Sequence, residues 1–237
     1  MLTIHFAPMQ GVTDARFRRQ HFLQQGGVDC YYTPFLRWER NGVRPKDRRD
    51  VLPIANQGVP VVPQVIAASR DEFCHLCDFL QKLGWTSIDF NMGCPFPMQT
   101  GHGRGAGLLQ YPDRVESILQ EMTSRGEVSF SVKMRLGQQS HDEAFALIPI
   151  LNEVPLHHVT LHPRLGVQQY TGTPDRDSFA RFYEQLRHPL VYNGDISSVE
   201  QVRLLQRQFP QLQGVMIGRA LVQNPQLAAQ IKRCCFV

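Results

Sequence analysis

Short apolar, β-branched runs alternate with longer amphipathic runs along nearly the whole chain of 237 residues. Alternation of this kind predicts a parallel sheet whose strands are joined by crossover helices. Eight runs have the character of strands, and eight in this order favour a closed (β/α)8 (TIM) barrel over an open, doubly wound sheet. The predicted strands are Thr3–Ala7, Cys30–Thr33, Pro60–Ile66, Thr86–Phe90, Val128–Met134, His157–Leu161, Pro189–Tyr192 and Gly214–Ile217.

The amphipathic runs predict a helix after most of these strands. One connection differs, because Phe35–Gly58 is rich in arginine and carries Pro45 and Pro53. We predict a long loop with a short helix there, on the active face of the barrel. The predicted helices are Asp14–Gln25, Arg70–Leu83, Asp113–Ser124, Asp142–Asn152, Asp175–Leu186, Ser198–Gln208 and Pro225–Lys232.

Charge and cysteine content narrow the class of protein. A net charge of +4 permits a polyanionic partner without requiring one. The six cysteines have no disulfide-framework spacing, which indicates a reducing cytoplasm. No run approaches the ~18 apolar residues that a membrane span needs. A monomer without membrane association is therefore expected.

One cysteine lies on a tightly shaped loop. The segment Asn91-Met92-Gly93-Cys94-Pro95 follows a predicted strand, and ligands bind at the C-terminal ends of strands in parallel α/β folds. A free thiol has an ordinary pKa of ~8.5, so Cys94 would be protonated at neutral pH and able to donate a proton. The alternative is a small buried side chain that only packs.

Two glycine pairs follow the seventh and eighth predicted strands, in Asn193-Gly194-Asp195 and Gly218-Arg219. In barrels these two loops commonly bind a phosphate through backbone N–H groups. Arg219 would add a charge-assisted hydrogen bond. Ordinary turn glycines are the alternative, but two pairs in the two expected loops favour a phosphate site.

Polar side chains also end other strands. Lys133 and Arg135 alternate at the end of the fifth strand, so both point to one side of the sheet, where a buried cation needs an anionic ligand. Gln64 and His162 end two further apolar runs. The alternative for Lys133 is a lysine that extends to the solvent at the barrel rim. The alternative for Gln64 and His162 is a hydrogen bond to a nearby loop.

Two other patterns have structural explanations. Cys74 and Cys77 have C-x-x-C spacing without a second pair, which favours helix packing over metal binding, and no metal site is expected. The basic run that begins at Arg37 is either a solvated loop or a contact for phosphates.

Taken together, the motifs resemble those of the tRNA-dihydrouridine synthases. Ala7–Asp14 followed by Phe17-Arg18 is similar to the opening signature of that family, A-P-M-x-G-V-T-D…F-R. Asn91–Pro95 is similar to its N-M-G-C-P motif, and Gly103–Leu109 to the continuation. The later motifs follow in the family's order: Lys133-Met134-Arg135, His162, Asn193–Asp195 and Gly218-Arg219.

The resemblance implies a (β/α)8 barrel that uses FMN and NADPH to reduce a uridine of tRNA to 5,6-dihydrouridine. Hydride would pass from flavin N5 to C6 of the base, and Cys94 would protonate C5. The cofactor-binding residues would be Pro8, Met9, Gln10, Gln64, Asn91, Lys133, His162, Asn193, Gly194, Asp195, Gly218 and Arg219. The RNA substrate would contact Arg37, Arg135, Arg164 and Tyr170.

The chain departs from the family pattern in places. Phe96-Pro97-Met98 stands where many relatives carry lysine, and His162-Pro163-Arg164-Leu165 where many have His-Gly-Arg-Thr. We expect the barrel over 1–233 and an irregular tail over 234–237, with the family's C-terminal helical tRNA-binding domain absent. Two alternatives stay open: a weakly active or silent flavin-binding barrel, and an FMN oxidoreductase that acts on free pyrimidines.

Overall fold

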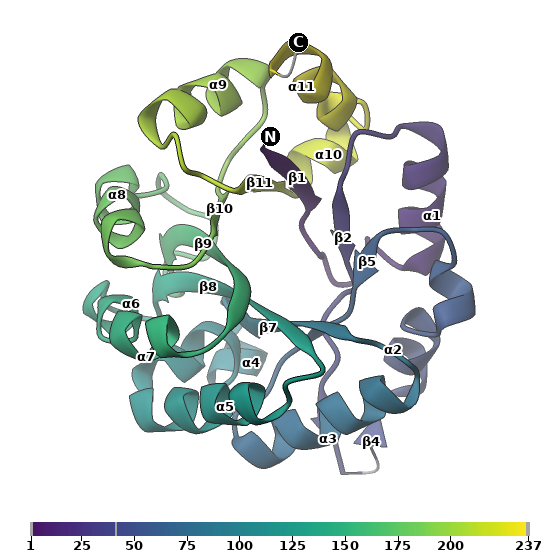
Figure 1. The fold of residues 1–237 in the computed structure, drawn as a ribbon, viewed down its shortest axis with the longest axis vertical. Helices are drawn as coiled ribbons and strands as arrows, with labels where there is room; N and C mark the ends of the chain where they lie inside the picture. The colour runs from purple at the N-terminus through teal and green to yellow at the C-terminus, as the bar shows by residue number, and fades with distance from the viewer. Residues whose placement is uncertain (1, 41, 236–237) are drawn as a thin grey trace.

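A ring of parallel strands surrounds the centre of the molecule, and helices cover its outside (Figure 1). The computed structural model describes residues 2–40 and 42–235. It confirms the predicted (β/α)8 barrel. The strands of the ring are β1 (Thr3–Phe6), β2 (Cys30–Tyr32), β5 (Val61–Val62), β6 (Gln64–Val65), β7 (Ser87–Met92), β8 (Ser129–Gly137), β9 (Leu156–Leu165), β10 (Leu190–Asn193) and β11 (Gly214–Ile217).

The ring closes through one strand that is interrupted in its middle. The sheet runs in the order β5-β2-β1-β11-β10-β9-β8-β7-β6, with β5 and β6 separated only by Pro63. Proline has no N–H for the ladder, so the strand breaks there. Its first half pairs with β2 and its second half with β7. The nine strands therefore occupy the eight positions of a closed barrel.

The helices follow the predicted runs closely, with one split. Residues 142–153 form two short helices rather than one, because Pro149 in the first turn of the second helix cannot continue the hydrogen bonds of the first. None of the helices in the described part of the chain combines the length and apolar character that crossing a bilayer requires. The principal helices are α1 (Ala15–Gln24), α3 (Arg70–Lys82), α5 (Pro112–Ser124), α6 (Asp142–Phe145), α7 (Ile148–Glu153), α8 (Arg176–Gln185), α9 (Val199–Gln208) and α11 (Leu227–Cys235).

The connections contain short elements that the sequence pattern did not predict. A small antiparallel pair, β3 (Trp38–Glu39) and β4 (Gly42–Val43), precedes the predicted short helix α2 (Pro45–Asp50). Elements of this length bury too few side chains to show a periodic pattern. The others are α4 (Pro97–Thr100), α10 (Arg219–Gln223) and the 3-10 turns η1 (Pro53–Asn56) and η2 (Gly105–Gln110).

The C-terminal helix corrects one prediction. An irregular tail was expected from residue 234, but α11 continues through Cys235. Cys235 packs against the core, and Arg203 of α9 donates a hydrogen bond to the carbonyl of Cys234 at 2.8 Å. These contacts hold the last helical turn. Residues 236–237 lie outside the described residues.

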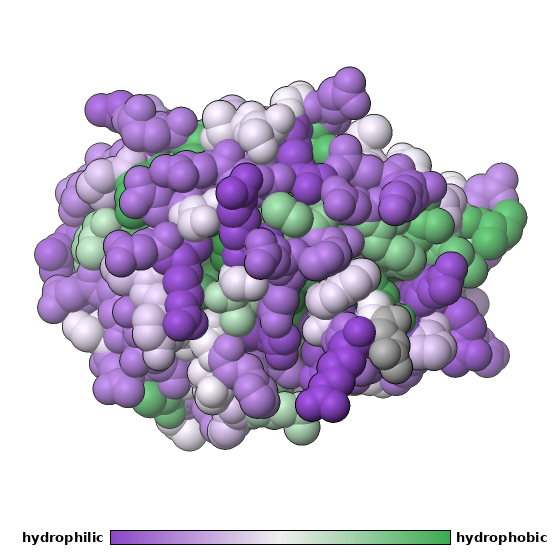
Figure 2. Space-filling view, turned by 90° about the horizontal axis from the view of Figure 1, so that it is seen from below, coloured by the Kyte–Doolittle hydropathy of each residue, from purple (hydrophilic) through white to green (hydrophobic). Residues whose placement is uncertain are grey.

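Side chains alternate between the two faces of the barrel strands. On β7 and β8 the outward residues, such as Phe90 and Phe130, pack against Phe73 of α3 in the main core. Seen from below, the outer surface is mostly hydrophilic with scattered apolar residues (Figure 2). The inward residues of the same strands are polar, Asp89 and Ser131 among them. The apolar core thus lies between strands and helices, and part of the barrel interior is free for polar groups.

Hydrogen bonds link four side chains inside the barrel near the N-terminal ends of the strands, and each group in the series donates to the next. Thr3 Oγ1 donates to the carbonyl of Gln213, so it accepts from His5 Nε2 at 2.8 Å. His5 Nδ1 must then accept from the hydroxyl of Tyr32 at 2.8 Å, and that oxygen accepts from His158 Nε2 at 3.1 Å. With both histidines neutral, every group of this chain has a partner.

Acid is therefore expected to destabilise the barrel. Burial lowers the pKa of His5 to about 4 and that of His158 to about 3, from an ordinary value of 6.5. Unfolding then takes up protons below pH 6.5, and stability falls by ~1.4 kcal/mol per pH unit for each histidine until the folded pKa is reached. Burial raises the pKa of Asp89 to about 6, so below pH 6 the folded protein takes up a proton there. This uptake partly offsets the loss of stability caused by the two histidines.

Thermal melts between pH 7.5 and pH 4.5 measure the effect. Removing one titrating group by His158→Gln should make the decline in melting temperature shallower. A melting temperature that stays level from pH 7 to pH 5 would contradict this description of the histidine pair.

Candidate active site

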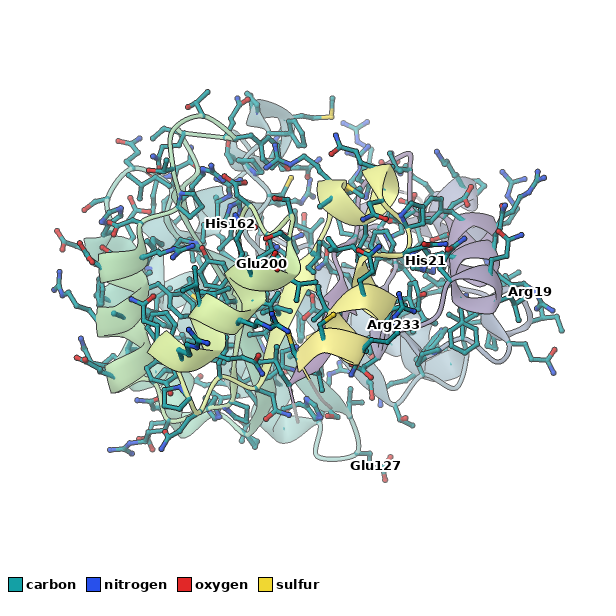
Figure 3. All side chains as sticks on the ribbon, turned by 90° about the horizontal axis from the view of Figure 1, so that it is seen from above. Arg19, His21, Glu127, His162, Glu200 and Arg233 are labelled. Carbon is teal, nitrogen blue, oxygen red and sulfur yellow. The ribbon has the colours of Figure 1, made fainter. Side chains whose placement is uncertain are left out.

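A cavity of ≈ 580 Å³ opens at the C-terminal ends of the barrel strands. Glu127, just before β8, and His162, near the end of β9, lie toward opposite ends of the barrel (Figure 3). All the cofactor-binding residues predicted above line this cavity, as do Cys94, Arg135, Arg164 and Tyr170. Residues from the first to the last strand of the ring are therefore brought together, as the motif order predicts.

Arg37 is the exception. It lies in a neighbouring hollow with Trp38, Met98 and Arg104, and its guanidinium is paired with Glu39 at 2.8 Å. Its Nη1 also contacts the sulfur of Met98 at 3.8 Å. Arg37 is thus beside the cavity rather than in it.

The loop that carries Cys94 is held by one side-chain oxygen. Asn91 Oδ1 accepts the backbone N–H groups of Gly93 at 3.0 Å and of Cys94 at 2.9 Å. The Cys94 side chain is buried against Phe35 and Ile66. Burial raises the pKa of the Cys94 thiol, although Arg135 and Lys133 act in the opposite direction. At neutral pH the group is a protonated thiol that can donate.

Gly105 supports this loop from below. Its φ is +59°, and a Cβ at this position would lie 2.6 Å from the carbonyl oxygen of Cys94 and 2.8 Å from its Cβ. We expect Gly105→Ala to displace Cys94 and to cost roughly 1–3 kcal/mol of stability. Denaturant titration measures the cost, and alkylation of Cys94 followed by peptide mass spectrometry reports the displacement.

Gly126→Ala is the matched control for that prediction. Gly126 has no positive φ and nothing within 4 Å of the added Cβ, so stability should change little. Equal effects of the two substitutions would show that the approach of Gly105 to Cys94 does not matter.

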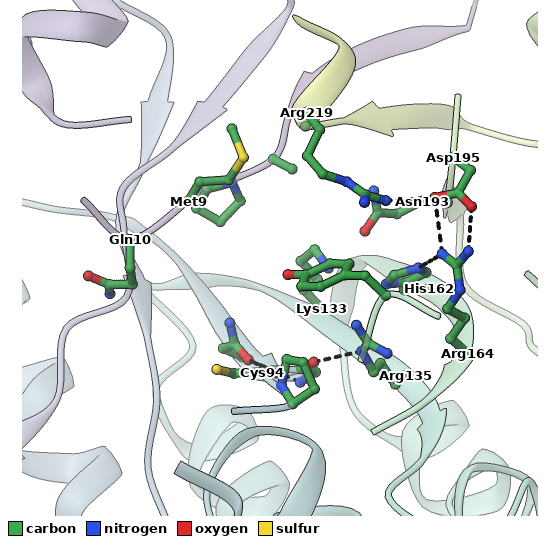
Figure 4. A pocket seen from close by; sticks show the side chains of 18 of the residues that line it. Met9, Gln10, Cys94, Lys133, Arg135, His162, Arg164, Asn193, Asp195 and Arg219 are labelled. Atoms are coloured by element: carbon green, nitrogen blue, oxygen red, sulfur yellow. Dashed lines mark hydrogen bonds and ion pairs between the residues drawn. The ribbon is translucent and has the colours of Figure 1, made fainter. Parts of the chain in front are cut away.

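Lys133 and Arg135 both point into the cavity from β8, as their spacing predicts (Figure 4). Arg135 is anchored by hydrogen bonds to the carbonyls of Gly93 at 3.0 Å and Leu165 at 2.8 Å. No hydrogen bond or ion pair between described residues involves the ammonium of Lys133. Burial and the charge of Arg135 lower the pKa of Lys133 to about 8, so it is mostly protonated at neutral pH. A ligand with an acceptor or a negative charge would satisfy it.

Arg164, Asp195 and Arg219 form a cluster at the other side of the cavity (Figure 4). Arg164 is 1% exposed and binds both carboxylate oxygens of Asp195. It also donates to the carbonyls of Thr171 and Gly172. Arg219 binds the same carboxylate at 2.8 Å. The hydrogen bond of Arg164 and the two positive charges lower the pKa of Asp195.

This cluster changes how two of the predicted residues can act. The N–H groups of Arg164 bind protein acceptors, so Arg164 positions the loops after β9 and β10 rather than binding a substrate. The carboxylate of Asp195 is likewise occupied, and Asp195 has a φ of +46°, a conformation uncommon outside glycine. It can therefore serve an anionic ligand only through its backbone.

Unused backbone donors gather at the ends of β10 and β11. None of the hydrogen bonds among the described residues uses the backbone N–H of Gly194, Asp195, Gly218 or Arg219. Gly218 lies close to the opening loop, because a Cβ there would be 3.3 Å from the Cβ of Ala7. Converging N–H groups beside an arginine are the usual components of a phosphate site.

His162 is neutral and has a fixed tautomer. Burial and the surrounding cations hold its pKa well below the ordinary value. Its Nε2 lies 3.3 Å from Nη1 of Arg164, and a guanidinium can only donate, so Nε2 accepts. Nδ1 therefore carries the proton and is the donor of this ring.

The opening loop shapes the remaining wall of the cavity. Thr13 Oγ1 accepts the backbone N–H of Met9 at 2.8 Å, and Gly11 turns the chain with a φ of +80°. Pro8 and Met9 thereby line the cavity with apolar surface. Gln10 also lines it, but its amide donates to the carbonyl of Phe35 at 2.9 Å and so braces the next loop.

Tyr170 stands at the mouth of the cavity and is 47% exposed. The guanidinium groups of Arg135 and Arg219 lie 5.5 Å and 4.8 Å from its ring centroid. An aromatic ring between cavity and solvent, with cations beside it, suits an aromatic ligand with negative charge.

Several lining residues were not predicted. Phe35 and Phe96 form part of the wall, and Phe96 is 49% exposed. Nothing in their sequence context separates them from ordinary loop residues. Within residues 2–40 and 42–235, no group of three or more His, Cys, Asp and Glu side chains is arranged to hold a metal ion.

Comparison with known proteins gives a family match over nearly the whole chain. The family model described as "Dihydrouridine synthase (Dus)" matches residues 5–236. The chain is 28% identical over 232 residues to tRNA-dihydrouridine synthase B of Pasteurella multocida, covering 94% of this chain and 67% of the relative. It is 30% identical over 239 residues to tRNA-dihydrouridine(16) synthase of Pseudomonas putida, covering 97% and 73%.

Solved structures share the fold at low sequence identity. Histamine dehydrogenase from Rhizobium sp. 4-9 superposes with a TM-score of 0.69 at 12% identity, over 97% of this chain and 45% of that one. Morphinone reductase in complex with tetrahydroNAD also gives 0.69, at 9% identity, over 97% and 86%. These similarities concern the barrel alone.

Proposed function

This chain belongs to the dihydrouridine synthase family, and we propose that it reduces a uridine of tRNA to 5,6-dihydrouridine with FMN as cofactor and NADPH as electron donor. One observation carries the proposal. A buried, protonated thiol, Cys94, and a lysine ammonium without a protein partner among the described residues, Lys133, face a single cavity at the strand ends. Reduction of a carbon–carbon double bond needs a hydride and a proton, and this site has the proton donor built in.

The cavity residues fit FMN. The volume of the cavity lies within the usual range for cofactor sites, about 300–1,000 Å³. The unused N–H groups of Gly194 and Gly218, with Arg219 beside them, suit the phosphate. Pro8 and Met9 supply apolar surface for a flat ring system, and the Lys133 ammonium supplies a positive charge for its polar edge.

The chemistry divides between cofactor and protein. When bound, FMN would supply the hydride that adds to C6 of the uracil. Cys94 would donate its proton to C5, and its raised pKa keeps the thiol protonated throughout the neutral range. The Nδ1–H of His162 is available to hold a carbonyl oxygen in the cavity, because Arg164 occupies the other nitrogen.

A uridine can reach this cavity only after it leaves its stack. Cys94 is 7% exposed, whereas Phe96 and Tyr170, which line the same cavity, are 49% and 47% exposed, so a base has to leave its stack to approach the thiol. Unpaired loops of a folded RNA release bases at the lowest cost. The net charge of +4 assists association with a polyanion.

NADPH oxidation tests the proposal against the free-pyrimidine alternative. The purified chain with FMN should oxidise NADPH faster when unmodified tRNA is present than when uracil or uridine is present at equal concentration. Stimulation by the free pyrimidines and not by tRNA would contradict tRNA as the substrate.

A further inference from the structure

We infer that Asp89, buried inside the barrel, is a positioning residue for the Cys94 loop, acting through Gln64 and Asn91. Asp89 and Gln64 are fully buried, and Asn91 is 7% exposed. Asp89 lies on β7 with Gln64 beside it on β6 and Ser131 beside it on β8. The inference rests on the proposed function in one respect, since it assigns Asp89 to the site in which Cys94 is the proton donor.

The three side chains form an unbroken chain of hydrogen bonds. Asp89 accepts from Ser131 Oγ at 2.6 Å and from Gln64 Nε2 at 2.7 Å. Gln64 Oε1 accepts from Asn91 Nδ2 at 2.8 Å. Asn91 Oδ1 then accepts the backbone N–H groups of Gly93 and Cys94. The chain therefore runs from the carboxylate to the catalytic loop through two amides.

The ends of this chain fix its direction. A carboxylate only accepts hydrogen bonds, and backbone N–H groups only donate them. Of the two orientations of each amide, one combination alone satisfies both ends. An amide turned the other way would place two acceptors, or two donors, in contact inside the barrel. Asp89 thus selects the orientation of Gln64, and Gln64 selects that of Asn91.

The carboxylate keeps this role at neutral pH. Burial raises the pKa of Asp89 to about 6, while its hydrogen bonds and the charge of Lys133 act in the opposite direction. Lys133 is the cation that acts on Asp89; on β9, Thr160 pairs with Lys133 and His158 pairs with Ser131. Above pH 6 the group is an acceptor, and it supports the loop through Gln64, which itself lines the cavity.

An exchange of carboxylate and amide tests the direction of the chain. Asn91→Asp alone puts carboxylates on both sides of Gln64, so one acceptor meets another. Asp89→Asn together with Asn91→Asp reverses the chain and satisfies every group. In that double variant the new amide at position 89 donates to Gln64, and Gln64 donates to the new carboxylate at position 91, which still accepts both backbone N–H groups. The readouts are melting temperature and the rate of Cys94 alkylation by iodoacetamide, followed by peptide mass spectrometry.

We expect Asn91→Asp to lower the melting temperature by roughly 5 °C and to change the alkylation rate of Cys94 about tenfold. The double variant should recover most of both changes. Asp89→Asn alone should change both readouts less than Asn91→Asp, since the new amide can accept from Gln64 through its oxygen while its nitrogen donates to Ser131. Should Asn91→Asp not fold, the inference predicts that the double variant still does.

Two results would overturn the inference. One is a double variant no better than the sum of the single ones, which would mean that the two positions are not coupled. The other is recovery of melting temperature without recovery of Cys94 alkylation, which would make Asp89 a stability residue only. Neither readout requires turnover. An intact coupling in a protein that reduces no tRNA would therefore reject the proposed function and leave the hydrogen-bond chain standing.

Discussion

Replacing Cys94 by alanine is expected to lower turnover ~10²–10⁴-fold, the range typical for loss of general-acid catalysis. The thiol is the only sulfur that lines the cavity besides Met9 among the described residues, and it is protonated at neutral pH. FMN affinity should be nearly unchanged, because the phosphate and ring contacts come from other strands. Single-turnover reduction of tRNA, with FMN titrated by its fluorescence, separates the two effects.

Cys234→Ala is the matched control for this substitution, since Cys234 is an exposed cysteine on α11. The Cys234→Ala variant should have the same turnover as the wild-type chain. Full turnover by the Cys94→Ala variant would remove Cys94 from the mechanism. The raised pKa adds a second expectation: ionisation of Cys94 should cause no loss of activity between about pH 6.5 and pH 8.5, the upper limit being the ordinary thiol pKa.

Replacing Arg164 by methionine is expected to destabilise the protein by about 1.5–3 kcal/mol, because it removes the charge-assisted hydrogen bonds of a buried guanidinium. Five hydrogen bonds of the guanidinium connect it to the carbonyls of Thr171 and Gly172, to Asp195, and to His162 on the same strand. Without them the loop after β10, which carries Gly194 and Asp195, keeps only the bond between Asp195 and Arg219 among these contacts. We also expect weaker binding of FMN, measured in the same fluorescence titration.

Arg187→Met provides the comparison. Arg187 is 76% exposed and its ion pair with Glu153 is 3.9 Å long, so its loss should cost no more than about 0.5 kcal/mol. Urea titration gives both free energies. A cost for Arg164→Met as small as that for Arg187→Met would show that the buried cluster does not anchor these loops.

The fold could be predicted because the same pattern, an apolar strand followed by an amphipathic helix, recurs along the chain. Each strand of the barrel carries outward apolar residues at alternate positions, and a single misjudged run does not alter the pattern. The ends were less predictable. β8 continues past the predicted Met134 to Gly137, and β9 past Leu161 to Leu165. Both extensions carry polar residues that face the cavity, and a search for apolar runs stops at such residues.

The candidate site was predictable where short motifs end strands, and less so where side chains pair across the ring. Asp195 and Arg164 are 31 residues apart, and only the barrel brings them together. Asp89 was missed because a carboxylate in an apolar strand gives no sign of its partners on β6 and β8. The sequence did not show that Arg37 pairs with Glu39, and its expected contact with the RNA substrate stays a prediction.

The most direct test of the account is dihydrouridine in tRNA, measured by nucleoside mass spectrometry. Unmodified tRNA would be incubated with the purified chain, FMN and NADPH, beside a reaction that contains the Cys94→Ala variant. We predict that dihydrouridine accumulates over many turnovers with the unmodified chain and far more slowly with the variant. A chain that binds FMN and forms no dihydrouridine would contradict the proposed function and favour a silent flavin-binding barrel.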